Sequence, residues 1–117
     1  MARVLVVDDD EAVRYVFGKY LARAGFEVHT AGTAAEAIAM ADAGPVDMLV
    51  TDQRMPGMRG DALIDWFRTN RPGVPALLVT AYAGEVGATP EGVAVMSKPV
   101  SGTELVEAVR QAIAAPS

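Results

Sequence analysis

Several residue types that carry chemistry in other proteins are rare or missing in this chain of 117 residues. It contains no cysteine, which excludes a disulfide framework, a thiolate metal site and a thiol nucleophile. It contains one histidine, His29, which excludes a metal site built from several histidines. The alternation of polar and apolar residues around His29 predicts a solvent-facing residue on an edge strand.

Long apolar runs and clusters of basic residues are missing as well. No run is long enough to cross a bilayer, and the chain does not open with a basic, apolar secretory leader. The formal net charge is −5, and the lysines and arginines form no cluster. This charge pattern argues against nucleic-acid binding. We therefore expect a cytoplasmic protein with no direct membrane contact and no nucleic-acid partner.

What the chain does contain is enough apolar sequence for one domain with one core. Hydrophobic residues make up 51% of it, well above the range of disordered chains. Short runs rich in β-branched residues predict buried strands at residues 3–7, 48–51 and 75–80, a weaker strand nearer an edge at 26–30, and a last strand at 93–96. Helical patterns alternate with these strands. The prediction is an α/β fold, a parallel sheet with helices on both faces and right-handed crossovers.

The helices are predicted from their ends and their apolar spacing. They lie between Asp10 and Gly25, between Thr33 and Gly44, around residues 63–67, and after Ser101. Capping boxes are expected at Thr33 with Glu36 and at Ser101 with Glu104. The core face of the first helix is expected to carry Ala12, Val13, Val16, Phe17, Tyr20, Leu21 and Ala24. Trp66 falls beside the apolar stripe of the third helix, which predicts either a partly covered surface aromatic or a contact for a partner.

The segment between the last two strands departs from this alternation. Residues 81–92 contain Gly84, Gly87 and Pro90, and they sustain no apolar stripe at helical spacing. A doubly wound sheet normally places a helix here. We expect at most one distorted turn, and therefore a reduced fourth helix.

Charged and hydroxyl side chains follow four of the predicted strands. Asp8 and Asp9 follow the first, Asp52 the third, Thr80 ends the fourth and Lys98 follows the fifth. In a parallel sheet these strand ends meet at one edge, where open α/β sheets bind their ligands. Three carboxylates in one pocket repel each other, so a divalent cation or shifted pKa values must relieve them. Hard oxygen ligands without histidine or cysteine favour Mg²⁺.

These residue types also suit phosphoryl transfer. A carboxylate can act as a covalent nucleophile and form an aspartyl phosphate. A metal ion, a lysine and a hydroxyl donor around the phosphoryl oxygens would stabilise the transfer. Taken singly, each residue also has a structural explanation: Asp52 could end a strand, Thr80 could favour β-structure and Lys98 could be a surface charge. A phosphoryl-accepting or metal-dependent site and a purely protein-binding module both remain open at this stage.

Four motifs nevertheless occur together and in order. They are Val7-Asp8-Asp9, Asp52-x-x-Met55-Pro56-Gly57, Thr80-Ala81 and Lys98-Pro99. Over the whole chain they resemble the receiver domain of two-component response regulators. The resemblance implies that residues 1–117 form a single receiver domain with a flavodoxin-like five-stranded sheet of order 2-1-3-4-5.

The resemblance also implies roles for individual residues. Asp52 would be the phosphoacceptor, with Mg²⁺ held by Asp9, Asp52 and the backbone carbonyl of Arg54, and by Asp8 through a water. Lys98 would pair with the phosphoryl group and form a cis peptide with the following proline. Thr80 would be the switch hydroxyl. The partner would be a sensor histidine kinase or a histidine phosphotransfer protein, docked beside the first helix. The chain would catalyse only its own aspartyl phosphorylation and dephosphorylation.

The chain departs from the family pattern near its last strand. Val95 stands where the family has an aromatic switch residue, and the interval from Thr80 to Lys98 is short. Short receivers of this kind are similar to those attached to hybrid sensor histidine kinases. Tyr82 is the aromatic of the 81–92 segment, so we expect the switch to involve Thr80, Tyr82 and the surface near residues 81–92, with Val95 unable to complete the usual movement. We also expect Arg54 and Tyr82 to shield the phosphoryl group.

Two alternatives compete with the phosphoacceptor function. A haloacid-dehalogenase-like hydrolase needs a second acid two residues after its nucleophile, where this chain has Arg54, so this alternative is rejected. A receiver-like protein-binding module that signals without phosphorylation is the more serious alternative. Loss of an acid, of the threonine or of the lysine would mark such a module, and this chain retains all of them.

Overall fold

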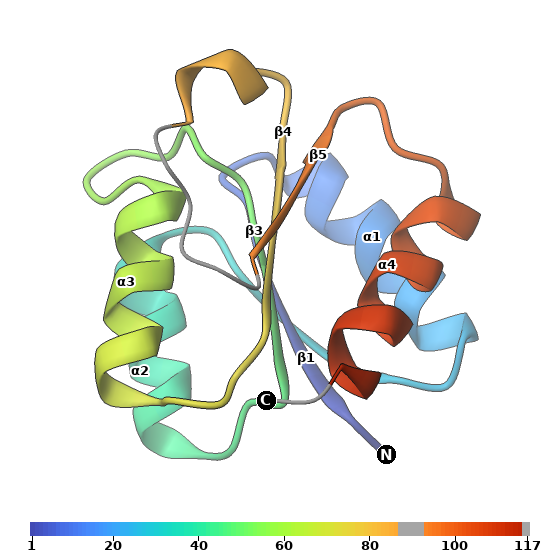
Figure 1. Ribbon diagram of the computed structural model, residues 1–117, viewed down its shortest axis with the longest axis horizontal. Helices are drawn as coiled ribbons and strands as arrows, with labels where there is room; N and C mark the ends of the chain where they lie inside the picture. Colours follow the sequence, from blue (N-terminus) through green and yellow to red (C-terminus); the bar gives the residue numbers. More distant parts are fainter. Residues whose placement is uncertain (87–92, 116–117) are drawn as a thin grey trace.

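The fold is a three-layer α/β sandwich, seen in a computed structural model that describes residues 1–86 and 93–115 (Figure 1). Its strands are β1 (Arg3–Val7), β2 (Glu27–Ala31), β3 (Met48–Thr51), β4 (Ala76–Thr80) and β5 (Ala94–Ser97). All neighbouring strands are parallel, and the sheet order is β2-β1-β3-β4-β5. Both the predicted class and the strand order implied by the resemblance are confirmed.

Helices cover both faces of the sheet. They are α1 (Glu11–Arg23), α2 (Ala34–Ala43), α3 (Gly60–Asn70) and α4 (Gly102–Ala114). In Figure 1, α2 and α3 lie on one face and α1 and α4 on the other. No helix among the described residues is long and apolar enough to span a membrane.

Successive strand residues feed two separate cores, because side chains alternate across a sheet. Leu5, Leu49 and Leu78 pack with residues of α2 and α3, whose largest buried side chain is Phe67. Val4, Val50 and Val79 point to the other face and pack with Leu21 of α1 and with Leu105 and Val109 of α4. Every residue of β3 and β4 is buried, which explains their continuous apolar sequences.

The two edge strands are the exposed ones. β2 exposes Glu27, His29 and Thr30, and His29 Nε2 lies 3.1 Å from Glu27 Oε2 on its solvent side. The predicted edge position of His29 is therefore confirmed. β5 forms the opposite edge, and Val95, which pairs with Leu78 of β4, is 38% exposed there.

The helix ends follow the predicted signals with one difference. The Asp10 carboxylate accepts hydrogen bonds from the backbone N–H groups of Ala12 and Val13 and caps α1. The capping box of Ser101 and Glu104 is complete. At α2 only half of the expected box forms. The Thr33 hydroxyl accepts from Glu36 N–H, but the Glu36 carboxylate accepts from Gly32 N–H, one residue before the cap.

One prediction for α1 is wrong. Val16 was expected on the core face but is 41% exposed, and Ala12 is exposed too. The buried residues are Phe17 and Leu21. Val16 precedes Phe17 by about 100° around the helix. This rotation takes it beyond the strip that the sheet and α4 cover.

Trp66 lies at the margin of the α2/α3 core. Its ring is half-buried and meets the Phe67 ring edge-on at a centroid distance of 5.3 Å, and the Arg71 guanidinium lies 5.6 Å from its centroid. The prediction that Trp66 is partly covered is thereby confirmed, and its role as a contact for a partner stays a prediction.

The segment after β4 begins with a single short 3₁₀ turn, η1 (Ala83–Glu85). In the described part of this segment, the expected distorted turn is therefore present in place of a helix. The remainder, residues 87–92, lies outside the described residues.

Candidate functional site

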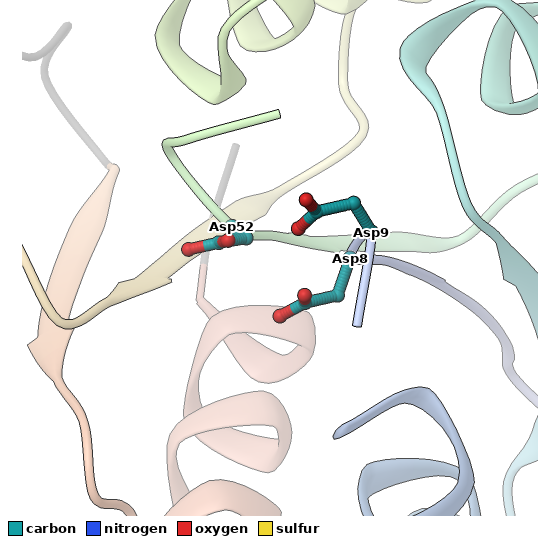
Figure 2. A group of neighbouring side chains, drawn as sticks. All are labelled: Asp8, Asp9 and Asp52. Carbon is teal, nitrogen blue, oxygen red and sulfur yellow. The ribbon is translucent and has the colours of Figure 1, made fainter. Parts of the chain in front are cut away.

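The predicted site residues meet at the carboxyl edge of the sheet. Asp8 and Asp9 follow β1 and Asp52 follows β3, which is the next strand in the sheet. Figure 2 shows their three side chains extending into the same space beyond the strand ends, and one carboxylate oxygen of each lies within 4.8 Å of the others. The parallel topology thus brings together carboxylates that are more than forty residues apart in sequence.

Lys98 reaches this cluster from the end of β5. Its Nζ lies 2.8 Å from Asp8 Oδ2 and 3.6 Å from Asp52 Oδ1, so one ammonium group bridges two carboxylates. Its backbone N–H donates to the Thr80 carbonyl oxygen at 2.9 Å, which continues the β4–β5 ladder. The Lys98–Pro99 peptide is cis, as the resemblance implies.

The surroundings of Asp52 disfavour its charge. The residue is 8% exposed, and this burial raises the pKa of its carboxyl group; repulsion from Asp8 and Asp9 acts in the same direction. The Lys98 ammonium and a hydrogen bond from the backbone N–H of Gln53 oppose this rise without cancelling it. Asp52 is therefore a carboxylate whose charge an added cation would stabilise.

Lys98 stays protonated in the same surroundings. Burial by itself lowers the pKa of its ammonium group, but the hydrogen bond to Asp8 and the charges of Asp8 and Asp52 outweigh burial and raise it. The site therefore combines clustered negative charge with one fixed positive charge.

Asp8 is held rigidly at the centre of the cluster. It is 2% exposed, and its two carboxylate oxygens accept from Asp10 N–H at 2.9 Å and from Lys98 at 2.8 Å. Its carbonyl oxygen accepts from Arg14 Nη1 at 2.6 Å. The contribution of Arg14 was not predicted, because nothing in the sequence distinguishes this arginine from others on exposed helix faces.

Thr80 and Tyr82 connect the site to the segment after β4. Thr80 is fully buried, and its hydroxyl oxygen accepts from Tyr82 N–H at 3.1 Å. The Tyr82 ring is 45% exposed, and the guanidinium carbon of Arg54 lies 3.7 Å from its centroid. The two residues that were expected to flank the phosphoryl group are thus in contact with each other.

The loop between β3 and α3 forms the wall of an adjacent cavity of about 550 Å³, which is lined by Asp9, Arg54, Met55, Pro56 and Arg59. Gly57 lies in this loop at a φ of +85°, in the left-handed region that favours glycine. The predicted Pro-Gly turn therefore shapes the entrance beside the carboxylates.

Two residues next to Asp52 were missed. Gln53 is 1% exposed and its side chain forms hydrogen bonds with Asp61. A Cβ atom on Gly60 would lie 2.0 Å from the Asp52 carbonyl oxygen, so α3 begins in direct contact with the backbone of Asp52. The glycine just before a predicted helix was a usable signal. The pairing of Gln53 with a residue eight positions away follows no local pattern.

Comparison with known proteins agrees with this geometry. The family model of the response regulator receiver domain matches residues 4–110. The chain belongs to this family. It is therefore a receiver domain of the two-component type, and the resemblance inferred from the four motifs is confirmed.

Individual relatives match this chain in sequence or in structure. The receiver is 33% identical to the transcriptional regulatory protein GlrR of Escherichia coli over 96% of this chain but 26% of GlrR, so it spans about a quarter of that relative. A CheY-like receiver domain from Methanospirillum hungatei has a TM-score of 0.85 and 30% identity, covering 97% of this chain and 94% of that one. The receiver domain of the hybrid histidine kinase CckA has a TM-score of 0.84 and 32% identity, covering 96% and 99%.

Proposed function

We propose that residues 1–117 act as a single, cytoplasmic receiver domain that accepts a phosphoryl group on Asp52 from a phosphohistidine partner. The donor is a sensor histidine kinase or a histidine phosphotransfer protein. The observation that carries this proposal is the position of Lys98, whose Nζ lies 2.8 Å from Asp8 and 3.6 Å from Asp52. A fixed cation at this distance can pair with oxygens of a phosphoryl group on Asp52.

The transfer requires Asp52 in its ionised form. One carboxylate oxygen attacks the phosphorus, a P–O bond forms, and the P–N bond to the donor histidine breaks with its electron pair leaving on the imidazole nitrogen. As negative charge grows on the phosphoryl oxygens, Lys98 shifts part of its pairing from Asp52 to those oxygens. Hydrolysis of the acyl phosphate by water returns Asp52, so the chain catalyses only its own phosphorylation and dephosphorylation.

Mg²⁺ fits the donor set of this edge. Among the described residues, Asp8, Asp9 and Asp52 supply three carboxylates within 4.8 Å, and hard oxygen donors are those that Mg²⁺ prefers. Asp9, Asp52 and the backbone carbonyl of Arg54 would hold the ion, with Asp8 in its outer shell because both Asp8 oxygens already accept hydrogen bonds. When bound, Mg²⁺ would neutralise charge on the carboxylates and the phosphoryl oxygens.

The switch proposed for this receiver is local. The Thr80 hydroxyl accepts from Tyr82 N–H, so a movement of Thr80 toward a phosphoryl group on Asp52 would pull on the segment that starts at residue 81. Val95 has a stiff β-branched side chain and lies on an exposed edge, which does not suit it to fill the space that Thr80 leaves. We therefore propose that phosphorylation changes the surface near residues 81–92.

Intact-mass measurement after incubation with acetyl phosphate and Mg²⁺ tests this function. The wild-type chain should gain one phosphoryl group, and Asp52→Asn should gain none. An unmodified wild-type chain under conditions that phosphorylate another receiver would refute the proposal and favour a binding module that signals without phosphorylation. A gain of mass that persists in Asp52→Asn would place the acceptor elsewhere.

A further inference from the structure

The backbone of Asp52 and Gln53 is held at two successive peptides. In the peptide that joins the two residues, the Asp52 carbonyl oxygen accepts from the Thr51 hydroxyl at 3.0 Å, and in the next peptide the Gln53 carbonyl oxygen accepts from Gly60 N–H at 3.0 Å. The Gln53 N–H of the first peptide acts on the Asp52 carboxylate and opposes the rise in its pKa. The orientation of that carboxylate therefore depends on the orientation of one peptide plane.

The side chain of Gln53 adds a second connection to α3. Its Oε1 accepts from Asp61 N–H at 2.8 Å, and its Nε2 donates to Asp61 Oδ2 at 3.0 Å. A primary amide that is 1% exposed is costly to bury unless it is hydrogen-bonded, and here both of its ends are paired with one residue. This two-point pairing fixes the distance and the angle between the end of β3 and the first turn of α3.

Close packing makes this connection act on Asp52 itself. A Cβ on Gly60 would lie 2.0 Å from the Asp52 carbonyl oxygen and 2.8 Å from Leu78 Cδ1, so the start of α3 touches the backbone of the phosphoacceptor. A small displacement of α3 would consequently be transmitted to Asp52. The pairing of Gln53 with Asp61 opposes such a displacement.

We propose that Gln53 and Asp61 are positioning residues for the phosphorylation of Asp52. Their paired hydrogen bonds hold the Asp52–Gln53 peptide so that one carboxylate oxygen is engaged by the backbone and the other is presented to the phosphodonor. They also anchor both ends of the loop that lines the cavity beside Asp9. This inference rests on the proposed function of Asp52 as the acceptor.

The test compares four single variants and one double variant with the wild-type chain. Gln53→Met keeps the length of the side chain but removes both hydrogen bonds, and Asp61→Ala removes the carboxylate acceptor. Asp61→Asn keeps an oxygen acceptor and removes only the charge. Asp65→Ala is the matched control, because Asp65 lies on the exposed side of the same helix. The readouts are the phosphorylation rate with acetyl phosphate at saturating Mg²⁺, the thermal midpoint, and the NMR amide proton shift of residue 53.

Gln53→Met and Asp61→Ala should each slow phosphorylation by roughly tenfold or more, the order of loss that misplacement of a reacting group produces. In Asp61→Ala the amide proton of Gln53 should shift, although Gln53 itself is unchanged. Asp61→Asn should keep the rate within about twofold of wild type and keep the amide shift, because the hydrogen bond remains. Combining Gln53→Met with Asp61→Ala should cost no more than Gln53→Met alone, since Gln53→Met already removes the hydrogen bond to the Asp61 carboxylate that Asp61→Ala removes.

The possible failures are distinguishable. A wild-type chain that is phosphorylated on Asp52, with unchanged rates in Gln53→Met and Asp61→Ala, would overturn this inference and leave the proposed function intact. Equal slowing in Asp61→Asn and Asp61→Ala would also overturn it, because the charge would then matter and not the pairing. If Gln53→Met does not fold, the variants of the half-buried Asp61 decide the question. An unphosphorylated wild-type chain would overturn the proposed function and this inference together.

Discussion

Asp52 carries its charge where water has little access and where two other carboxylates lie close by. It is 8% exposed, and burial followed by repulsion from Asp8 raises its pKa. Lys98 offsets part of this cost but bonds more closely to Asp8 than to Asp52. The ionised Asp52 therefore destabilises the folded domain, and binding of a cation or removal of the charge would stabilise it.

The first prediction is that Asp52→Asn stabilises the chain at neutral pH in the absence of Mg²⁺. Because the pKa of Asp52 is higher in the folded than in the unfolded chain, ionisation favours unfolding, and stability falls as the pH rises through the interval between the two pKa values. The neutral amide in the Asp52→Asn variant does not ionise and escapes this loss. The thermal midpoint at pH 7 should rise by about 3–6 °C, the shift that ~1 kcal/mol produces in a domain of this size.

The pH dependence supplies the control for this prediction. The difference between Asp52→Asn and wild type should shrink as the pH falls toward and below the unfolded pKa of aspartate, about 3.9, because residue 52 of the wild type is then increasingly protonated in both the folded and the unfolded chain. Asp9→Asn should have a smaller effect, since Asp9 is exposed. An advantage of Asp52→Asn that is the same at pH 4 and pH 7 would contradict the electrostatic cause.

The second prediction concerns Mg²⁺. The ion should stabilise the wild-type chain by mass action, by about 2.7 kcal/mol at a hundredfold excess over its Kd. Asp9→Asn should abolish this stabilisation because it removes one of the three clustered carboxylates. Calorimetry or Trp66 fluorescence measures the binding. Undiminished affinity in Asp9→Asn would show that the ion binds elsewhere.

At the scale of secondary-structure elements, the site depends on how loops and helix ends meet. The loop after β3 and the turn after β4 touch through Arg54 and Tyr82, whose guanidinium and ring lie 3.7 Å apart. The start of α3 touches the backbone of Asp52 through Gly60. The first contact joins loops 28 positions apart and the second joins consecutive elements, and each has a measurable consequence.

The third prediction is that Arg54 and Tyr82 prolong the lifetime of the aspartyl phosphate. Arg54 follows the acceptor by two residues and stacks on the Tyr82 ring, and we expect this pair to restrict the approach of water. Arg54→Ala with Tyr82→Ala should speed the loss of phosphate roughly two- to fivefold, the factor that corresponds to ~0.5–1 kcal/mol for a cation–π contact. Decay measured by intact mass in the absence of donor tests this. Slower or unchanged decay in the double variant would show that the pair does not shield the phosphoryl group.

The fourth prediction contrasts two glycines. Gly60→Ala should lower the free energy of unfolding by about 1–3 kcal/mol or more, because its Cβ would overlap the Asp52 carbonyl oxygen at 2.0 Å. Gly18→Ala, inside α1, should raise it by about 0.5–1 kcal/mol, since its Cβ would meet Val28 at an ordinary 3.7 Å. Urea unfolding measures both. Equal effects of the two substitutions would contradict the close approach at α3.

In the molecule as a whole, the described residues form a sheet with a buried centre and an atypical edge at β5. β1, β3 and β4 are almost fully buried and carry the acidic residues and Thr80 at their ends. β5 is short and exposed, and the segment that precedes it starts with a single 3₁₀ turn in place of a helix. We therefore expect phosphorylation of Asp52 to change the structure mainly at the exposed β5 edge of the sheet.

The fifth prediction is that beryllofluoride with Mg²⁺ alters amide exchange around Asp52 and in residues 81–92. The hydrogen bond from Tyr82 N–H to the Thr80 hydroxyl should break or change as Thr80 moves, and protection at Tyr82 should change with it. α4, whose buried Leu105 and Val109 pack on the sheet, should change little. A broad change along β5 and α4 with residues 81–92 unaffected would refute a local switch.

Much of the molecule followed from patterns that are local in sequence. Apolar runs and helical spacing predicted every strand and helix of the described structure, because burial of one face imposes a period on the chain. Parallel pairing then predicted that Asp8, Asp52, Thr80 and Lys98 would share one edge, because all strands of such a sheet end on the same side. The motifs added the family, which the comparisons confirm.

Tertiary structure alone decided which side chains touch. The exposure of Val16 depends on how far α4 and the sheet wrap around α1. Arg14 reaches the carbonyl of Asp8, and Gln53 reaches Asp61, through loop geometry that no periodic pattern encodes. Lys98 bonds to Asp8 across ninety positions and lies farther from Asp52. Such contacts depend on distances of a few ångströms between packed elements, whereas sequence periodicity specifies only which face of an element is buried.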